Sequence, residues 1–191
     1  MLKKEEAAKI FTEAGALLEG HFLLTSGRHS NRYMQCAQVL KYPEATEKLA
    51  VHIKEAFTGV QIDLVIGPAM GGILVAYEVA RQLGVPAMFT ERQDSEMQLR
   101  RGFSIQPGQK VLVVEDVITT GGSVQEVINA VKALGGEIAG VGVLVDRSGG
   151  KTDFGVKLAA VLEMEIESWE NSECPLCKAG QGAPVKPGSR S

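Results

Sequence analysis

Near the middle of the sequence, four apolar residues are followed directly by two carboxylates. Val111 to Val114 run without a polar residue between them, which is typical of a strand buried on both faces of a parallel sheet. Glu115 and Asp116 come next and are expected at the carboxyl end of that strand, where open α/β sheets bind their ligands. The segment therefore favours an α/β fold with a central, mostly parallel sheet flanked by helices.

A cluster of hydroxyl and glycine residues leads from the two acids into a helical pattern. Apolar side chains recur with helical spacing from Val124 to Leu134. A turn with little side-chain bulk lets several backbone N–H groups point at one anion, and the positive end of the helix dipole adds to them. We therefore predict a phosphate-binding loop. Its candidate residues are Val117, Ile118, Thr119, Thr120, Gly121, Gly122 and Ser123.

The two acids need a partner other than the phosphate, because they would repel it. Carboxylates accept hydrogen bonds and therefore suit vicinal sugar hydroxyls or a hydrated Mg²⁺. We interpret the segment as a ribose 5-phosphate site, with Glu115 and Asp116 as the candidate catalytic residues. The structural alternative is a buried strand and a Thr or Ser helix cap, with acids that only favour a helix start. The sequence contains no Walker A lysine and no G-x-G-x-x-G fingerprint that would compete.

The composition is that of an ordinary globular protein. Of the 191 residues, 45% are hydrophobic and 23% charged, which is enough for one domain with a sizeable core. The net charge of −3 does not indicate a nucleic-acid-binding protein. The first residues lack the apolar stretch of a secretory signal, and no apolar run approaches the ~18 residues of a membrane span. Three cysteines cannot form a disulfide framework, so we expect a cytoplasmic protein with no membrane partner.

Helices and strands are predicted to alternate along the chain. Apolar spacing and glycine or proline punctuation predict helices over residues 3–18, 44–57, 73–83 and 124–134. Short apolar runs predict strands over residues 22–24, 62–66, 86–90, 111–114, 138–145 and 157–165. The first helix precedes the first phosphate-type motif, so it is expected to lie outside the main α/β unit.

Two segments before the central strand each allow two interpretations. The glycine-rich turn from Gly67 to Gly72 follows a predicted strand, so Gly71 and Gly72 could offer backbone donors to an anion. Alternatively, these glycines only satisfy the geometry of a tight turn. The polar segment 91–102 predicts a mobile loop that closes over a substrate, or else an exposed hairpin.

Two segments after the central helix also allow two interpretations each. Arg147 follows a predicted strand and could grip a planar carboxylate with two parallel hydrogen bonds, or form an ion pair with Asp146 or Asp153. Cys174 and Cys177 form one C-x-x-C, which is half of a tetrahedral zinc site. Two copies across a symmetric dimer could supply four thiolates, and the alternative is a pair of free thiols in a surface turn.

Two motifs together resemble one enzyme family. Residues 111–123 closely resemble the phosphoribosyl-pyrophosphate motif of type I phosphoribosyltransferases. Residues 22–33, FLLTSGRHSNRY, are similar to the N-terminal hood of orotate phosphoribosyltransferases, although Thr25 stands where many members have a lysine. The sequence is identified on these motifs as a member of that family. The resemblance implies a helix and hood over residues 1–40, a core over 41–168, and a tail with the C-x-x-C over 169–191.

The resemblance also implies a reaction. It is the Mg²⁺-dependent transfer of ribose 5-phosphate from phosphoribosyl pyrophosphate to orotate, giving orotidine 5′-monophosphate and diphosphate in pyrimidine biosynthesis. Glu115 and Asp116 would hold the ribose hydroxyls, and the loop that ends at Ser123 would hold the 5′-phosphate. Thr119 and Arg147 would contact orotate. Mg²⁺ is the implied cofactor, and no side chain is assigned as its direct ligand.

The remaining implied roles involve the hood, the second glycine turn and the loop 91–102. Ser26 and Arg28 would lie over the base, whereas Gly71 and Gly72 would receive the diphosphate. The loop lacks the lysines and histidine of many members and has only Arg92, Arg100 and Arg101, among which Arg92 is a candidate and the diphosphate contact stays open. The family further implies a homodimer in which this loop reaches the neighbouring active site.

Two other functions compete with this interpretation. A purine phosphoribosyltransferase would share the sugar-phosphate site, but the hood and Arg147 suit an acidic pyrimidine better. A non-catalytic regulator could use the same fold to bind nucleic acid. The net charge of −3 and the lack of an added helix-turn-helix segment argue against that regulator.

Overall fold

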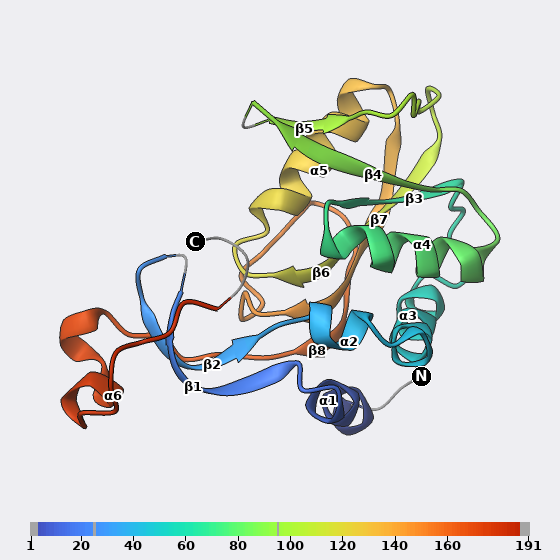
Figure 1. Ribbon diagram of the computed structural model, residues 1–191. Helices are drawn as coiled ribbons and strands as arrows, with labels where there is room; N and C mark the ends of the chain where they lie inside the picture. The colour runs from blue at the N-terminus through green and yellow to red at the C-terminus, as the bar shows by residue number, and fades with distance from the viewer. Residues whose placement is uncertain (1–3, 25, 95, 188–191) are drawn as a thin grey trace.

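A six-stranded sheet forms the centre of the computed structural model, which describes residues 4–24, 26–94 and 96–187 (Figure 1). The strand order is β5-β4-β3-β6-β7-β8, with every neighbouring pair parallel except β4 and β5. The strands are β3 (Leu64–Pro68), β4 (Ala87–Gln93), β5 (Glu96–Leu99), β6 (Lys110–Ile118), β7 (Glu137–Asp146) and β8 (Leu158–Glu163). The predicted α/β fold with a mostly parallel sheet is confirmed. Thr25, where the sequence departs from the family, lies outside the described residues.

Helices cover both faces of this sheet. The helices are α2 (Ala37–Leu40), α3 (Pro43–Ala56), α4 (Gly71–Leu83) and α5 (Gly122–Ala133). Leu112 and Val114 of β6 belong to the hydrophobic core that α3 and α4 share. Val111 and Val113 belong to the core on the other side, with the apolar face of α5. Alternate side chains of a strand point to opposite faces, so four successive apolar residues are needed to fill two cores.

The N-terminal helix is shorter than predicted and belongs to the core. Helix α1 (Lys4–Glu13) ends before Gly15, whose φ of 67° is incompatible with a continuing helix. Leu17 and Leu18, which extended the helical spacing in the sequence, instead begin strand β1 (Leu17–Leu23), so that part of the prediction was wrong. The helix packs against β8, and its Phe11 is buried in the same core as α3. It therefore does not lie outside the main α/β unit.

The polar segment 91–102 overlaps a hairpin, formed by β4 and β5, rather than an irregular loop. Glu91 pairs with Gln98 and Arg92 with Met97 between the antiparallel strands β4 and β5. The structure shows the hairpin of the second alternative, and the closure of this segment over a substrate stays a prediction. In β5 only Met97 and Leu99 are apolar, and they pack against the core beside α5, so the alternation is too short to stand out among the polar residues around it.

A two-stranded ribbon and the C-terminal segment lie together beside the core. Strand β1 pairs with β2 (His29–Met34) in antiparallel fashion. The C-terminal segment contains a short 3₁₀ helix, η1 (Asn171–Glu173), and a single helical turn, α6 (Pro175–Lys178). Figure 1 shows this red segment against the blue ribbon, and backbone bridges join His29 to Trp169 and Phe22 to Val185. In the described ranges, no helix has the length and apolar character needed to cross a membrane.

Candidate active site

The carboxyl end of β6 opens into a cavity that contains almost all of the predicted phosphate-site residues. Its volume is about 250 Å³, and it lies where β6 passes into α5. Asp116 is the one predicted residue of this segment that does not line it. The lining residues are Arg92, Glu115, Val117, Ile118, Thr119, Thr120, Gly121, Gly122, Ser123, Val124 and Glu126.

The loop between β6 and α5 has the backbone geometry expected of an anion site. Gly121 adopts a φ of 76°, and a Cβ there would lie 2.7 Å from a methyl carbon of Thr152 and 2.8 Å from the ring of Phe154. Only glycine fits this position. No side chain in the described residues caps the N-terminus of α5, so the predicted alternative of a Thr or Ser cap is not observed. The first N–H groups of α5 therefore have no side-chain acceptor, and its positive dipole end faces the same loop.

Glu115 and Asp116 are neighbouring acids held mostly away from water. Glu115 is only 8% exposed, and burial followed by the adjacent Asp116 charge raises its pKa well above the usual range. Burial also raises the pKa of Asp116. Backbone N–H groups of Asp116 and Val117 donate to Glu115 Oε1 at 3.0 Å and to Asp116 Oδ1 at 2.9 Å. Neither acid forms an ion pair with a basic side chain in the described part of the chain, so both retain acceptor capacity for hydroxyl groups or a cation.

The second glycine-rich turn lies directly against these acids. It connects β3 to α4 and contains a cis peptide bond between Ala69 and Met70. A Cβ on Gly71 would lie 2.3 Å from Asp116 Oδ2, and one on Gly72 would lie 3.2 Å from Glu115 Oε1. The structure therefore brings the two glycine turns, which are about 50 residues apart in sequence, to one site at one edge of the sheet.

Arg147 reaches the same edge from the end of β7. Its backbone N–H donates to the carbonyl oxygen of Ile118 at 2.9 Å, which fixes it beside the end of β6. The Nε of Arg147 is buried without a hydrogen-bond partner in the described ranges, and burial lowers the pKa of this guanidinium. A buried donor without a partner is costly unless a ligand satisfies it.

The predicted alternative for Arg147 was an ion pair with a nearby aspartate, and the structure does not contain it. The Oδ1 of Asp146 accepts the N–H of Ser148 at 2.7 Å, and that of Asp153 accepts the N–H of Gly155 at 2.8 Å. Neither aspartate forms an ion pair with Arg147 among residues 4–24, 26–94 and 96–187. The guanidinium is therefore available to a planar acceptor such as a carboxylate.

Arg28 is not free to reach the site in this structure. Its Nε donates to Ser168 Oγ at 2.9 Å, one terminal nitrogen donates to the Ser168 carbonyl at 2.6 Å, and the other pairs with Glu170 at 2.5 Å. The neighbouring Ser26 is exposed. The structure thus ties the hood arginine to the C-terminal segment, whereas Arg92 lines the cavity and forms an ion pair with Glu126 of α5.

Sequence reasoning missed two groups beside the site. The thiol of Cys36 donates to the backbone carbonyl of Asp116 at 3.7 Å, and burial followed by the charges of the two acids raises its pKa. Tyr33 lies close enough to Arg147 to oppose part of the lowering of the guanidinium pKa that burial causes. Tyr33 ends the hood motif of residues 22–33, which could have pointed to it, whereas no motif or spacing in the sequence marks Cys36.

Comparisons with known proteins point to one family. Residues 36–172 match the phosphoribosyl transferase domain family. The curated orotate phosphoribosyltransferase of Desulforamulus reducens is 61% identical over 189 residues, which are 99% of this chain and 98% of that protein. Among solved structures, the orotate phosphoribosyltransferase of Aeropyrum pernix has a TM-score of 0.67 at 29% identity, covering 82% of this chain and 93% of that one.

A second solved structure leads to the same conclusion. The orotate phosphoribosyltransferase of Mycobacterium tuberculosis in complex with inorganic phosphate has a TM-score of 0.68 at 27% identity, covering 84% of this chain and 95% of that one. The matched family domain contains both glycine turns, both acids and Arg147. This chain therefore belongs to the phosphoribosyl transferase domain family and, within it, to the orotate phosphoribosyltransferases.

Proposed function

We propose that the site at the carboxyl edge of the sheet transfers the ribosyl 5-phosphate group of phosphoribosyl pyrophosphate to N1 of orotate. One observation carries this proposal. An anion-binding loop, two buried acids without basic partners and a guanidinium with an unpartnered Nε converge on one edge of the sheet. Each of these groups complements one part of the two substrates.

The geometry supports a binding role for each of these groups. The loop from Thr119 to Ser123 holds the 5′-phosphate through backbone N–H groups and hydroxyls. Glu115 and Asp116 accept hydrogen bonds from the two ribose hydroxyls. The turn that contains Gly71 lies against Asp116 and receives the diphosphate with its backbone N–H groups. Arg147 holds the orotate carboxylate, and Thr119 contacts the base.

The reaction needs no protein nucleophile. N1 of orotate forms a bond to the anomeric carbon and loses its proton, while the bond from that carbon to the diphosphate oxygen breaks and diphosphate leaves with the electron pair. Positive charge develops on the sugar in an oxocarbenium-like transition state, as in other glycosyl transfers. The adjacent acids stabilise that charge, and positioning of both substrates supplies much of the remaining rate enhancement.

The residues of the site also suit Mg²⁺ as a cofactor. Two buried neighbouring carboxylates would repel each other when ionised, which favours the approach of a cation, and oxygen ligands are those that Mg²⁺ prefers. Glu115 and Asp116 are the side chains that would hold the hydrated ion together with the ribose hydroxyls. When bound, the ion supplies neutralisation of the negative charge on the diphosphate.

The proposed oligomer is a homodimer, supported by an exposed apolar stripe at the start of α4. Met70, Leu74 and Tyr77 are 79%, 50% and 67% exposed and recur at helical spacing beside the glycine turn of the site. An apolar stripe of this kind is typical of a protein interface. We also place the protein in the cytoplasm, which three cysteines without a disulfide support.

The test is the loss of orotate ultraviolet absorbance on addition of phosphoribosyl pyrophosphate and Mg²⁺. Asp116→Asn should remove most of kcat, because the amide keeps the acceptor for Val117 but loses the negative charge. Asp63→Asn is the matched control, since the Asp63 carboxylate accepts the backbone N–H of Lys110 at the opposite end of β6. Full activity in Asp116→Asn, or turnover of adenine or hypoxanthine in preference to orotate, would overturn the proposal.

A further inference from the structure

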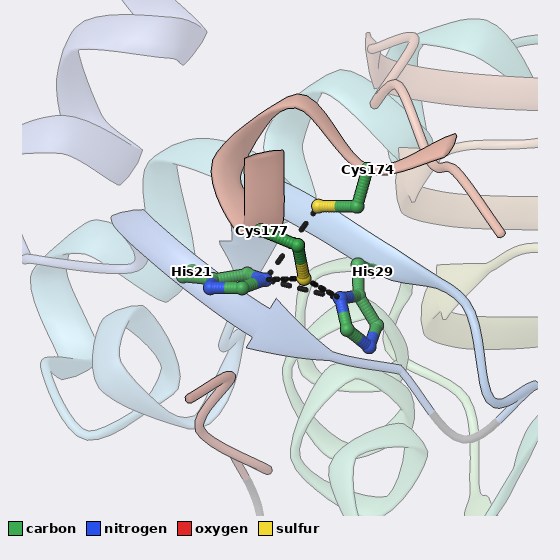
Figure 2. Close-up of side chains that lie close together, drawn as sticks. All are labelled: His21, His29, Cys174 and Cys177. Carbon is green, nitrogen blue, oxygen red and sulfur yellow. Dashed lines mark hydrogen bonds between the residues drawn. The ribbon is translucent and has the colours of Figure 1, made fainter. Parts of the chain in front are cut away.

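Four metal-ligating side chains from opposite ends of the chain converge away from the proposed active site. His21 lies on β1, His29 on β2, Cys174 at the start of α6 and Cys177 within α6 (Figure 2). The sequence alone left the cysteines as half of a site completed by a second copy, or as thiols in a surface turn. The structure instead places two histidines of the same chain beside them, and Cys174 is fully buried.

We propose that these four residues bind one Zn²⁺ ion in a closed, structural site. The four ligand atoms, one from each side chain, all lie within 4.8 Å of one another. His21 Nε2 is 3.0 Å from His29 Nδ1 and 3.6 Å from each of the two sulfur atoms, and Cys177 Sγ is 3.3 Å from His29 Nδ1.

These distances are close to the edges of a zinc tetrahedron. With Zn–N bonds of about 2.05 Å and Zn–S bonds of about 2.3 Å, tetrahedral angles place two nitrogens about 3.3 Å apart and a nitrogen and a sulfur about 3.6 Å apart. The observed nitrogen–nitrogen distance of 3.0 Å and nitrogen–sulfur distances of 3.3 and 3.6 Å differ from these edges by at most about 0.3 Å. The two remaining edges, from Cys174 Sγ to Cys177 Sγ and to His29 Nδ1, are within 4.8 Å, so shifts of about 1 Å or less would let all four atoms coordinate an ion at their centre.

Hydrogen bonding alone does not explain this arrangement. The Nδ1 of His21 donates to the carbonyl oxygen of Gly182 at 2.9 Å, because a carbonyl can only accept. The Nε2 of the neutral ring therefore carries one lone pair and no proton. Three groups approach that single nitrogen within 3.6 Å, namely His29 Nδ1 and both thiols. One lone pair cannot accept three donors, whereas a metal ion at the centre uses every ligand atom once.

The surroundings also suit the ion. The bond from His21 Nδ1 to Gly182 fixes the ring tautomer that presents Nε2, which is the usual support for a metal-bound histidine. Two cysteine thiolates would balance the charge of Zn²⁺, so the site would be neutral. A neutral site suits this cluster, because three of its four residues are buried. The Cys177 thiol lies 3.5 Å from Asn171 Oδ1, and a 180° rotation of that amide would place its NH₂ group to donate to a thiolate.

The fold gives this ion a mechanical role. Between residues 163 and 187, Cys174 is the only buried side chain, so this segment has no hydrophobic core of its own. It is held to the ribbon by backbone hydrogen bonds of His29 with Trp169 and of His21 with Val185. Zinc would cross-link the ribbon to the C-terminal segment at the residues that make these bonds. With four protein ligands, the site leaves no open position for catalysis.

The test measures metal in the full-length, untagged protein, and it does not depend on the proposed reaction. Protein purified without chelator should contain about one zinc per chain, and Co²⁺ added to stripped protein should give the visible absorption of a tetrahedral site with thiolate ligands. Cys177→Ser and His29→Ala should lose this stoichiometry. Cys36→Ser and His52→Ala are matched controls, because they change the one cysteine and the one histidine outside the cluster.

Proteolysis supplies a readout that requires no variant. Chelation of wild-type protein should make trypsin cleavage at Lys178, in the C-terminal segment, at least about tenfold faster, and one equivalent of Zn²⁺ should reverse this. Less than about 0.1 zinc per chain with no Co²⁺ spectrum would overturn the proposal. So would equal zinc in Cys177→Ser and wild type, or a Cys174–Cys177 disulfide found by thiol titration of freshly purified protein.

Discussion

Replacing Gly71 with alanine tests whether Asp116 must remain where the structure holds it. A Cβ on Gly71 would lie 2.3 Å from Oδ2 and 2.5 Å from Cγ of Asp116, whereas ordinary contacts begin at 3.4 Å. The carboxylate must therefore retreat by about 1 Å, away from the 2.9 Å hydrogen bond that Val117 donates to it. A misplacement of about 1 Å lowers catalytic rates about 10²-fold. That factor corresponds to about 2.7 kcal/mol of transition-state stabilisation.

The assay is kcat for orotate consumption, with the melting temperature measured on the same preparations. Gly71→Ala should lower the melting temperature less than a substitution that strikes backbone, since it displaces the Asp116 side chain only. Gly67→Ala is the contrasting variant, because its Cβ would lie 2.4 Å and 2.9 Å from the backbone carbonyl oxygens of Gly72 and Val114. Backbone cannot move aside as easily as a side chain, so the main effect of Gly67→Ala should be a lower melting temperature. A folded Gly71→Ala enzyme with wild-type kcat would refute the reasoning, because the carboxylate position would then not matter.

Three further substitutions probe other parts of the site. Because the pKa of Glu115 is raised, the folded state keeps this proton more tightly than the unfolded chain, and the free energy of unfolding falls as pH rises from the ordinary glutamate range through the raised pKa. Glu115→Gln should remove this dependence of the free energy of unfolding on pH, so the variant should melt at a higher temperature than wild type at about pH 8 while losing activity. The same pH dependence in the variant and in wild type would contradict this. Arg147→Ala should raise the KM for orotate at least about tenfold with a smaller effect on phosphoribosyl pyrophosphate, and an unchanged KM would reassign the base site. Tyr77→Glu should give monomers in sedimentation, whereas Leu134→Glu, at the end of α5, should not; a dimeric Tyr77→Glu would place the interface elsewhere.

Buried elements were the most predictable part of the fold. The run from Val111 to Val114 identified the central strand because each residue fills one of two cores, which no amphipathic helix would require. The spacing from Val124 to Val131 likewise identified α5, whose apolar face is buried throughout. The prediction still ended β6 four residues early, because the acids that follow Val114 are polar although they continue the strand. Their burial depends on the turn of Gly71, which is remote in sequence.

Predictions failed where contacts between distant segments decide the structure. Leu17 and Leu18 continued the helical spacing of α1, but pairing with β2 places them in a strand. Arg28 was assigned to the base by resemblance; the structure shows its side chain bonded to Ser168 and Glu170, and its role at the base stays a prediction. The histidines of the four-residue cluster are about 150 residues from its cysteines, so no local spacing could join them.

The acids at the end of β6 show how instability can serve binding. Two buried neighbouring carboxylates without a basic partner in the described residues destabilise each other, which is why burial and mutual charge raise the pKa of Glu115. Backbone N–H groups satisfy only one oxygen of each acid, so the fold alone does not relieve the repulsion. Ribose hydroxyls and a cation would supply the missing donors and charge. The same feature that lowers the stability of the free protein therefore favours the ligand, because binding is strongest for groups that the protein has left unsatisfied.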